Sequence, residues 1–480
     1  MTMADQKRVY LLYPPISKME RYSSDVGSVG GEQIPLGIFY LASYLRENGY
    51  LVSVTDAEAL KLTEEQIVNE IKTCSPDFIG ISSTTVAFHR ALGVARLIKN
   101  QFPGTPLILG GPHVTSNAEH AMSFDAFDYG VLGEGEITAL ELFNRLSNGE
   151  TVHDVSGIAY RDKNGDVKRT SKREFIKTLD MLPIPAYDLI PDIQLYTPPP
   201  SNYKTLPVVN LITSRGCPNE CTFCDRNVFG RKYRERSAEN VFHEIKYLWD
   251  HYHIREIAFV DDTFLINKRR IVKLFELLND AGMHFPWTCM ARINNVDYEF
   301  LRYLKRNGCW NIAFGIESGD EAILKVIKKN ISLEAVKNVI TWCSKLKIKT
   351  KGFFIVGHPL ETIETIDKTI SFACSLKLDA VVVTINTPIP GSQQFAEARA
   401  YGALDESDWS KFNYWRPVFV PKGLSEEVLL SKQKEFYMRF YLRPRIAMIY
   451  LLSFFGRGGL KRFKSIFKLF GYVVPKKKSP

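Results

Sequence analysis

The sequence predicts an α/β protein with two strand–helix domains followed by a mainly helical C-terminal region. Short apolar runs that suit buried strands alternate with amphipathic stretches that suit helices, and a proline-rich stretch interrupts this alternation once. The length of 480 residues is also more than one ordinary core accommodates. We therefore expect an α/β domain at 1–150, a β-like segment and linker at 151–200, a second α/β domain at 201–400 and the helical region at 401–480.

The first domain alternates apolar runs with stretches of helical periodicity. Strands are expected at 9–13, 51–55, 78–82, 106–110 and 129–132, and helices at 35–48, 63–73, 87–100 and 137–146. This alternation predicts a parallel, doubly wound sheet that binds its ligand at the carboxyl ends of the strands. Small residues and glycines there would suit a large planar ligand, although ordinary turns use the same residue types. The candidate binding residues are Tyr13, Pro14, Ser82, Ser83, Thr84, Gly110, Gly111, Pro112, His113, Gly133, Glu134 and Gly135.

The second domain follows a β-like stretch at 155–169, with a turn signal at Asn164-Gly165, and a proline-rich linker at 182–200. Its strands are expected at 208–213, 256–260, 287–291, 312–315, 352–356 and 380–385. Six strand–helix units are too few for a closed eight-stranded barrel. They predict a partial (β/α)6, TIM-like barrel with its active site at the carboxyl ends of the strands.

The positive charge of the chain is concentrated in its last fifty residues. The net charge of +9 divides into +12 for residues 431–480, with thirteen Lys or Arg and one acid, and −3 elsewhere. Apolar residues at helical spacing after Gly459 predict a basic amphipathic helix, which could rest on anionic lipid headgroups or pack with a solvated basic face. RNA binding by this tail is a third interpretation. Without a secretory leader or an apolar run of about 18 residues, we expect a cytoplasmic protein whose membrane contact, if any, is peripheral at the inner face.

Three cysteines in one short loop carry the strongest functional signal. Cys217, Cys221 and Cys224 immediately follow the first strand of the second domain, and the loop is too tight for useful disulfides. A structural zinc ion or an iron–sulfur cluster usually takes four protein ligands. Three cysteines therefore leave one metal position open for chemistry. A zinc ion completed by a distant residue and unliganded cysteines remain the alternatives.

The C-x3-C-x2-C spacing, with Phe223 before the last cysteine, resembles the motif of the radical S-adenosylmethionine (SAM) superfamily. The resemblance implies a 4Fe–4S cluster on the three cysteines, with SAM bound to the open iron. Downstream strand ends also resemble cofactor contacts of that superfamily. The SAM-binding residues that it implies are Phe223, Asp261, Asp262, Arg292, Glu317 and Ser318. Each has a structural alternative, such as a helix N-cap for Asp262, a solvated turn for Glu317 and a salt bridge for Arg292.

The order of the domains is similar to that of the cobalamin-binding radical SAM enzymes, which carry a flavodoxin-like, Rossmann-type domain ahead of the barrel. That resemblance implies bound cobalamin, although the Asp-x-His-x-x-Gly loop that supplies a histidine to cobalt is absent. His113 is a candidate substitute ligand, and a polar loop residue is its alternative. The family chemistry implied is methylation of an unactivated carbon by an adenosyl radical and methylcobalamin. Oxidative cyclisation or ring rearrangement of a tetrapyrrole-like substrate is the second interpretation.

The resemblance also implies partners and competing classes. We expect a small-molecule substrate, lipid-like or tetrapyrrole-like, and an electron donor such as a flavodoxin or ferredoxin. A radical methylthiotransferase acting on RNA would need three further N-terminal cysteines, but only Cys74 precedes Cys217. Nucleic acid is therefore not an expected partner. A non-catalytic iron–sulfur or zinc protein that senses redox state or binds nucleic acid is the alternative of another class.

Overall fold

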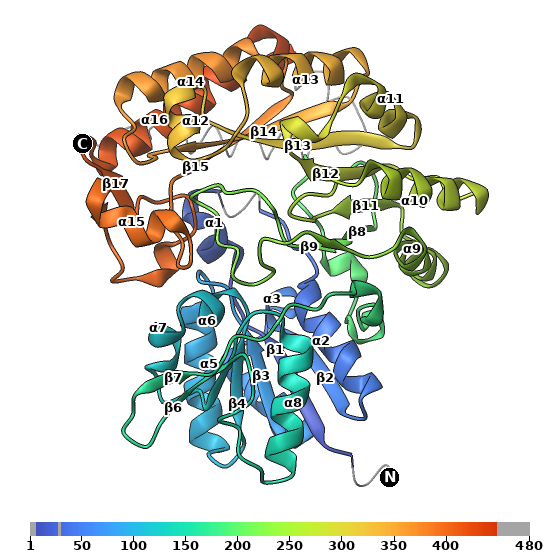
Figure 1. Cartoon of the computed structure of the whole chain (residues 1–480), viewed down its shortest axis with the longest axis vertical. Coiled ribbons are helices and arrows are strands. Elements are labelled where there is room, and N and C mark those ends of the chain that lie inside the picture. The colour runs from blue at the N-terminus through green and yellow to red at the C-terminus, as the bar shows by residue number, and fades with distance from the viewer. Residues whose placement is uncertain (1–5, 27–29, 449–480) are drawn as a thin grey trace. The chain divides into compact units, whose positions relative to one another are not determined.

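The computed structural model describes residues 6–26 and 30–448, which form two compact units (Figure 1). The first comprises the described residues up to 17, together with 34–195 and 225–235. The second comprises 18–33, 196–224 and the described residues from 236 onward. We expected each domain to be one continuous stretch of the chain. Instead, residues 18–33 belong to the second unit although their neighbours in the sequence belong to the first, and residues 225–235 belong to the first unit although their neighbours belong to the second.

The first unit contains a seven-stranded sheet in the order β2-β1-β3-β4-β5-β6-β7. Its strands are β1 (Arg8–Tyr13), β2 (Leu51–Asp56), β3 (Phe78–Ser82), β4 (Leu107–Gly110), β5 (Tyr129–Val131), β6 (Ile158–Arg161) and β7 (Val167–Arg169). The first five pair in parallel, and β6 and β7 continue the sheet antiparallel. The predicted doubly wound α/β sheet is thus confirmed, and β6 and β7 add a hairpin to its edge.

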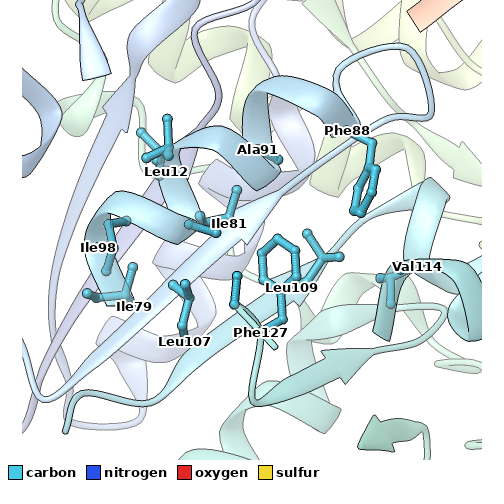
Figure 2. Close-up of a cluster of buried hydrophobic side chains, with 14 of the residues drawn as sticks. Leu12, Ile79, Ile81, Phe88, Ala91, Ile98, Leu107, Leu109, Val114 and Phe127 are labelled. Carbon is cyan, nitrogen blue, oxygen red and sulfur yellow. The ribbon is translucent and has the colours of Figure 1, made fainter. Parts of the chain in front are cut away.

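Helices pack on this sheet and close its core. They are α2 (Leu36–Glu47), α3 (Ala57–Leu60), α4 (Glu64–Cys74), α5 (Phe88–Gln101), α6 (Pro112–Ser116), α7 (Ala118–Met122) and α8 (Gly135–Ser147). A capping box starts α4, because the Thr63 hydroxyl accepts from the Gln66 amide while the Gln66 side chain accepts from the Thr63 amide. Figure 2 shows the core, in which Phe88 of α5 lies near Leu109 of β4 and Ile98 of α5 lies near Ile79 of β3. Each such large side chain contributes about 1.5–3 kcal/mol when fully buried.

The second unit is built on a six-stranded parallel sheet in the order β15-β14-β13-β12-β11-β8. Its strands are β8 (Val208–Leu211), β11 (Glu256–Phe259), β12 (Trp287–Ala291), β13 (Cys309–Glu317), β14 (Lys349–Val356) and β15 (Ala380–Ile385). Its helices are α9 (Ala238–Tyr252), α10 (Lys268–Asp280), α11 (Tyr298–Arg306), α12 (Glu321–Val326), α13 (Leu333–Lys345) and α14 (Ile363–Ser375). Neighbours in the sheet are neighbours in the chain, which confirms the predicted open, partial barrel.

The remaining elements of the described chain are short or lie toward its C-terminal end. They are α1 (Lys18–Val26), α15 (Gln393–Tyr401), α16 (Glu426–Tyr441), β9 (Ser214–Arg215), β10 (Arg234–Glu235), the ribbon of β16 (Gly402–Leu404) with β17 (Phe419–Pro421), and the 3-10 turns 179–181, 187–189, 193–195, 293–295 and 409–411. The predicted basic helix after Gly459 lies outside the described residues. Within the described part of the chain, no helix has both the length and the apolar character needed to cross a membrane.

The two faces of the second sheet differ in burial. The helices cover one face, where side chains such as Ile312, Phe314 and Phe354 are fully buried. On α16, Gln433 and Tyr437 hydrogen-bond the main chain of Val383 in β15, which holds that helix against the edge strand. The opposite, concave face is partly exposed toward the carboxyl ends of the strands. Ligands of parallel α/β sheets bind at that end.

Candidate cofactor site

The cysteine loop follows β8 and β9 and brings its three sulfurs near one another. The side-chain nitrogen Nδ2 of Asn219 donates to the Cys217 sulfur at 3.2 Å, and the Arg292 guanidinium donates to the Cys221 sulfur at 3.2 Å. Cys224 keeps an exposed edge. Even so, the protein packed around its sulfur and the neighbouring thiols of Cys221 and Cys217 raise the pKa of Cys224 to about 12. Within residues 6–26 and 30–448, no three His, Cys, Asp or Glu side chains are placed to hold one metal ion together. Ligands of a 4Fe–4S cluster need no such convergence, because each thiolate binds a different iron.

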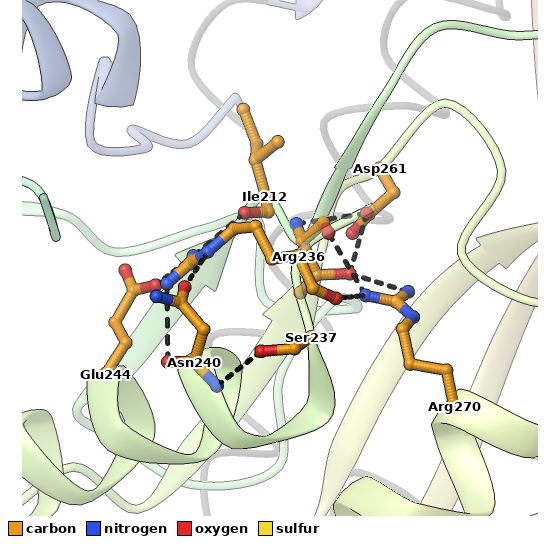
Figure 3. A network of polar contacts seen from close by, with 8 residues as sticks. Ile212, Arg236, Ser237, Asn240, Glu244, Asp261 and Arg270 are labelled. Carbon is orange, nitrogen blue, oxygen red and sulfur yellow. Dashed lines mark hydrogen bonds and ion pairs between the residues drawn. The ribbon is translucent and has the colours of Figure 1, made fainter. Parts of the chain in front are cut away.

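A buried polar network fixes the chain where it enters this loop (Figure 3). One carboxylate oxygen of Asp261 accepts from the Thr213 amide at 3.0 Å, from the Thr213 hydroxyl at 2.8 Å and from the Ser214 hydroxyl. Arg270 donates to the Thr213 carbonyl and hydroxyl, each at 3.0 Å. Asp261 was predicted to contact SAM, but this oxygen instead holds the main chain ahead of the cysteines. Its other carboxylate oxygen, Oδ2, is buried and has no hydrogen-bond partner among the described residues.

The same network continues on the other side of the β8 strand end (Figure 3). Arg236 forms a buried ion pair with Glu244 and donates to the side chain of Asn240 at 2.6 Å and to the Ile212 carbonyl at 3.3 Å. Ser237 caps α9 by accepting from the Asn240 amide at 3.1 Å. The cysteine loop therefore starts from a main chain that side chains of α9, α10 and the β11 end all hold.

A second ion pair lies beside the cysteine loop. Glu317 ends β13 with a positive φ of 70°, a conformation that costs a non-glycine residue energy, and binds Lys329 at 2.7 Å. Both side chains are buried, and the Lys329 ammonium lies 5.8 Å from the centre of the Phe223 ring. Arg292 joins the two features, because it donates to Cys221 and to the Lys329 carbonyl. The structure thus brings the predicted residues Phe223, Arg292 and Glu317 together around the loop.

Two other residues predicted to bind SAM lie differently. The Ser318 hydroxyl is fully buried, shares a hydrogen bond with the Thr369 hydroxyl at 3.1 Å and accepts from the Asp320 amide at 3.2 Å. Ser318 therefore stabilises the turn after β13. Asp262 is exposed, and the surrounding protein and the neighbouring Asp261 raise its pKa. Its side chain has no part in the network that holds Thr213 (Figure 3).

A group of buried polar atoms in the second unit lacks hydrogen-bond partners within the described chain, and of the residues that carry them only Asp261 is in the predicted SAM-binding set. They are Asp261 Oδ2, Thr263 Oγ1, both ring nitrogens of His358, Glu361 Oε1, Asn386 Nδ2 and Gln394 Oε1. Burial and the nearby Lys329 lower the pKa of His358 to about 3, so its ring is neutral. Burial raises the pKa of Glu361 to about 8, although its other oxygen accepts from the amides of Gly357 and His358.

Several of these side chains surround the cysteine loop. Gln394 donates to the Thr222 hydroxyl at 3.1 Å, and the rings of His358 and Phe223 lie 6.0 Å apart. Asn386 follows β15 and donates its main-chain amide to Val356 of β14. A buried polar group without a partner costs about 1–3 kcal/mol. A ligand that supplied several hydrogen bonds here would remove that cost, so the geometry points to a polar ligand beside residues 222–223.

At the carboxyl ends of the strands of the first sheet, the connecting loops pack closely against one another. The conformation of Gly111 has a φ of +96°, and a Cβ there would lie 2.7 Å from the Ser83 carbonyl oxygen, so the loops after β3 and β4 meet at a glycine. His113 is fully buried, with one ring nitrogen 3.2 Å from the Thr85 hydroxyl and the other 3.1 Å from a His120 ring nitrogen. This geometry leaves neither nitrogen for cobalt, and we correct the His113 ligand prediction to a packing role.

Glu134 also serves the fold, although it was predicted to line the cobalamin site. Its carboxylate forms a bidentate pair with Arg234 at 3.0 and 2.8 Å and accepts from the Ile176 amide at 2.8 Å. Both side chains of the pair are about 5% exposed or less. Arg234 also lies 5.0 Å from the Phe175 ring centre. The pair therefore secures the segment 225–235 to the first unit.

A pocket of about 220 Å³ opens beside this pair, within the first unit. The ends of β5 and β7, the start of α8 and the loop after β7 line it. Its residues are Thr115, Ser116, Leu132, Gly133, Glu134, Ile137, Gly157, Arg169, Thr170, Lys172, Arg173, Glu174, Phe175, Ile176 and Asn227. A 150 Å³ apolar cavity holds benzene, so this volume suits a somewhat larger ring system but not a whole corrin.

Comparison with known proteins decides the family. The Radical SAM superfamily model matches residues 211–373, and the B12 binding domain model matches residues 22–143. An uncharacterized methyltransferase of Pyrococcus horikoshii, PH0819, is 34% identical over 472 residues, which cover 97% of this chain and 96% of that protein. The chain belongs to the cobalamin-binding radical SAM enzymes. It is thus an enzyme that uses a 4Fe–4S cluster, SAM and cobalamin.

Other members of the family show its range. An anaerobic magnesium-protoporphyrin IX monomethyl ester cyclase of Rubrivivax gelatinosus is 28% identical over 445 residues, covering 91% of this chain and 77% of that protein. Two solved structures share the fold of the radical SAM enzyme described here. The cobalamin-dependent radical enzyme OxsB gives a TM-score of 0.74 at 18% identity over 98% of this chain and 75% of that one. The methyltransferase TsrM of Kitasatospora setae gives a TM-score of 0.69 at 15% identity, and the match covers 97% of this chain and 99% of that one.

The residues of both units fit these cofactors by their own chemistry. SAM offers an amine, a carboxylate, hydroxyls and a base, which match the unpartnered atoms and cations beside the cysteine loop. In the first unit, small residues follow the neighbouring parallel strands β3, β4 and β5, namely Ser83, Gly111 and Gly133, which suits a planar corrinoid, and the buried Thr84 hydroxyl has no described partner. Lys329 was missed because its sequence neighbours look like a charged surface turn.

Proposed function

We propose that this radical SAM enzyme methylates an unactivated carbon of an apolar small molecule. One observation carries the proposal: the cysteine loop, Arg292, the Glu317–Lys329 pair and several unpartnered polar atoms gather at the carboxyl ends of the second sheet. The name of the 34% identical relative supports methyl transfer over other outcomes. The partly exposed apolar face of the same sheet supports an apolar substrate.

In this proposal Cys217, Cys221 and Cys224 bind three irons of the cluster and leave the fourth for the methionine end of SAM. When bound, the cluster and SAM supply an adenosyl radical that abstracts a hydrogen atom, and cobalamin supplies the methyl group. Arg292 and Lys329 place two cations beside the cysteine loop and would orient the SAM carboxylate. Asp262 or Glu317 would bind its amine, and the rings of Phe223 and His358 would flank its base.

We also propose that the 220 Å³ pocket holds the detached lower base of cobalamin. Its volume suits a bicyclic ring, and its lining includes Gly133 and Glu134 of the predicted cobalamin set. Lys172, which lies over the Phe175 ring at 4.9 Å, would face the phosphate of the nucleotide tail. The other predicted cobalamin residues, at the ends of β1, β3 and β4, would then face the corrin.

Oxidative cyclisation is the second candidate reaction. Three similar proteins are named as anaerobic magnesium-protoporphyrin IX monomethyl ester cyclases, at 26–28% identity. The same site would serve both reactions, since each begins with hydrogen abstraction from an unactivated carbon. Product analysis separates them, because only the methylase adds the mass of a methyl group to its substrate.

Two further proposals concern partners. A flavodoxin or ferredoxin would reduce the cluster, and anaerobic SAM cleavage with each reduced protein tests this directly. We also propose that the C-terminal stretch beyond residue 448, with eight of the thirteen basic residues, contacts anionic lipid from the cytoplasmic side. Flotation with anionic liposomes of the full chain and of a chain ending at residue 455 would decide it, and equal flotation of both would refute it.

The central experiment is anaerobic reconstitution with iron, sulfide and hydroxocobalamin. Wild type, Cys217→Ala and Cys74→Ala are then mixed with SAM and a strong reductant. We expect wild type and Cys74→Ala to bind about four irons and form 5′-deoxyadenosine, because Cys74 lies in α4 of the first unit. Cys217→Ala should lose both. Equal iron content and turnover in the two variants would contradict the cluster assignment.

A matched pair of tryptophan variants tests the base pocket. Ile137 lines the pocket from α8, whereas Leu146 lies on the same helix and outside the pocket. Ile137→Trp should fill the pocket and lower the cobalamin retained after gel filtration at least tenfold. Leu146→Trp should retain about one cobalamin per chain. If both variants retain cobalamin equally, the base lies elsewhere.

A further inference from the structure

The concave face of the second sheet changes character along its strands. Toward the carboxyl ends it presents partly exposed, mostly apolar side chains, namely Ala258, Val260, Met290, Phe353, Ile355, Val382 and Thr384. They share a face because side chains alternate along a strand and the register pairs Phe353 with Val382 and Ile355 with Thr384. This face is an apolar wall below the cysteine loop, and Met290 is 39% exposed although it lies in a central strand.

Toward the other end of the strands the same face becomes buried and polar. Lys351 lies on β14, two and four residues before Phe353 and Ile355, and the register places it level with Ala313 of β13 and Met290 of β12. The buried polar side chains of Asn311 and Thr288 lie two residues nearer the amino ends of those strands. Its ammonium donates to the side-chain oxygen of Asn202 and to the Ser201 hydroxyl at 3.3 Å. Both partners are neutral. Within the described chain no carboxylate lies within ion-pair distance of Lys351.

Glu256, at the start of β11, is an acid at the amino end of the same sheet, but its carboxylate has hydrogen-bond partners other than Lys351. Its carboxylate accepts from the main-chain amides of Lys204 and Thr205 at 2.6 and 2.8 Å and from the Trp310 ring nitrogen at 2.8 Å. Burial raises the pKa of Glu256 despite these bonds. Glu256 therefore does not form an ion pair with Lys351.

A buried ammonium without a counter-charge is energetically costly, so its persistence needs a reason. Burial lowers the pKa of Lys351 to about 8, which still leaves most of it protonated at neutral pH. An anionic group delivered by a ligand would supply the missing charge. The apolar wall above Lys351 would hold the rest of such a ligand.

We propose that the substrate is an apolar molecule with one anionic group, of which a carboxylate is the simplest, and that Lys351 binds this group. The inference rests on the proposed function for the position of the reacting carbon beside the cysteine loop. Lys351 and Ile355 are four residues apart on one strand, which separates their Cα atoms by about 13 Å. The anionic group and the reacting carbon would be separated by a similar length.

The test uses the reconstituted holoenzyme and two probes of equal shape, 4-(1-pyrenyl)butyric acid and 4-(1-pyrenyl)butanol, in equilibrium dialysis. Wild type should bind the acid at least tenfold more tightly than the alcohol. Lys351→Met should lose this preference and keep its affinity for the alcohol. Lys349→Met is the matched control, because Lys349 is exposed on the same strand and should leave the preference unchanged.

Asn202→Asp tests the same inference in a chain that keeps its lysine. The new carboxylate would sit at the atom that already accepts from Lys351 and would neutralise it internally. This variant should remain folded and lose at least tenfold in acid affinity. Equal binding of acid and alcohol by wild type, no binding of either, or an unchanged preference in Lys351→Met and Asn202→Asp would each overturn the proposal.

Cofactor content and 5′-deoxyadenosine formation are measured on the same samples, so the two proposals fail separately. A lost acid preference with intact SAM cleavage refutes the role of Lys351 alone. An intact acid preference in a protein that binds neither cluster nor cobalamin refutes the proposed reaction, and Lys351 remains an anion site.

Discussion

The two sheets each place a histidine just after a glycine at the carboxyl end of a strand. His113 follows Gly111 after β4, and His358 follows Gly357 after β14. Both rings are fully buried, and burial lowers the pKa of each to about 3. His113 has a partner at each ring nitrogen and a close ring contact with Phe88, whereas neither nitrogen of His358 has a partner within the described chain.

The presence or absence of hydrogen-bond partners distinguishes buried polar groups that stabilise the fold from buried polar groups that are available to bind a ligand. At the first sheet the buried side chains of His113 and Glu134 bond to other parts of the same unit. At the second sheet His358 and Gln394 keep unused hydrogen-bonding atoms beside the cysteine loop. Substitutions at the first sheet should therefore lower the free energy of unfolding, and substitutions at the second should lower ligand affinity.

The largest effect is expected for Glu134→Leu. Removing this carboxylate leaves the Arg234 guanidinium buried without its charge partner, which should lower the free energy of unfolding by about 3–5 kcal/mol. Urea unfolding followed by circular dichroism measures it. Asp188→Ala is the control, because the Arg46–Asp188 pair is 41% and 50% exposed and should contribute less than about 1 kcal/mol. Similar decreases in the free energy of unfolding of the two variants would show that the buried Glu134 pair contributes no more to stability than an exposed pair.

The two histidines test the comparison directly. His113→Phe removes the partner of Thr85 and His120 and should lower the free energy of unfolding by about 1–3 kcal/mol, with cobalamin retained. His358→Phe removes no described hydrogen bond of the ring, so stability should change by less than about 1 kcal/mol. Its dissociation constant for SAM should rise about tenfold, as equilibrium dialysis would show. A stability loss in His358→Phe equal to that in His113→Phe would break the comparison.

Local patterns were enough to predict the sheets and the cysteine loop, because apolar periodicity and an eight-residue C-x3-C-x2-C motif both depend only on residues that are close in the sequence. The ion pair of Glu134 with Arg234 could not be predicted, because Arg234 lies 100 residues away and shows no local signal. Lys329 lies in a Lys-Lys-Asn sequence that is typical of an exposed turn. Its buried ion pair with Glu317 is apparent only from the structure. The sequence also could not predict that one carboxylate oxygen of Asp261 holds the Thr213 main chain while the other lacks a partner within the described chain.

The buried carboxyl of Glu361 introduces a pH dependence of stability. Burial raises its pKa from 4.5 to about 8, so between these values the folded protein holds a proton that the unfolded chain releases. Stability therefore falls as pH rises from about 5 to 8, by at most about 1.4 kcal/mol per pH unit from this group. Glu361→Gln keeps an oxygen for the amides of Gly357 and His358 but cannot ionise.

The Gln variant should match wild type near pH 5 and become the more stable protein near pH 8, and its curve should lack the fall. The depressed pKa of His358 acts in the opposite direction below about pH 6.5 and is present in both proteins, so it cancels in the difference. Glu364→Gln, at an exposed position on α14, should leave the pH dependence of wild type nearly unchanged. If Glu361→Gln follows the wild-type curve from pH 5 to 8, the carboxyl is already ionised in the folded protein. The second sheet would then present a charged rather than a neutral surface to its ligand.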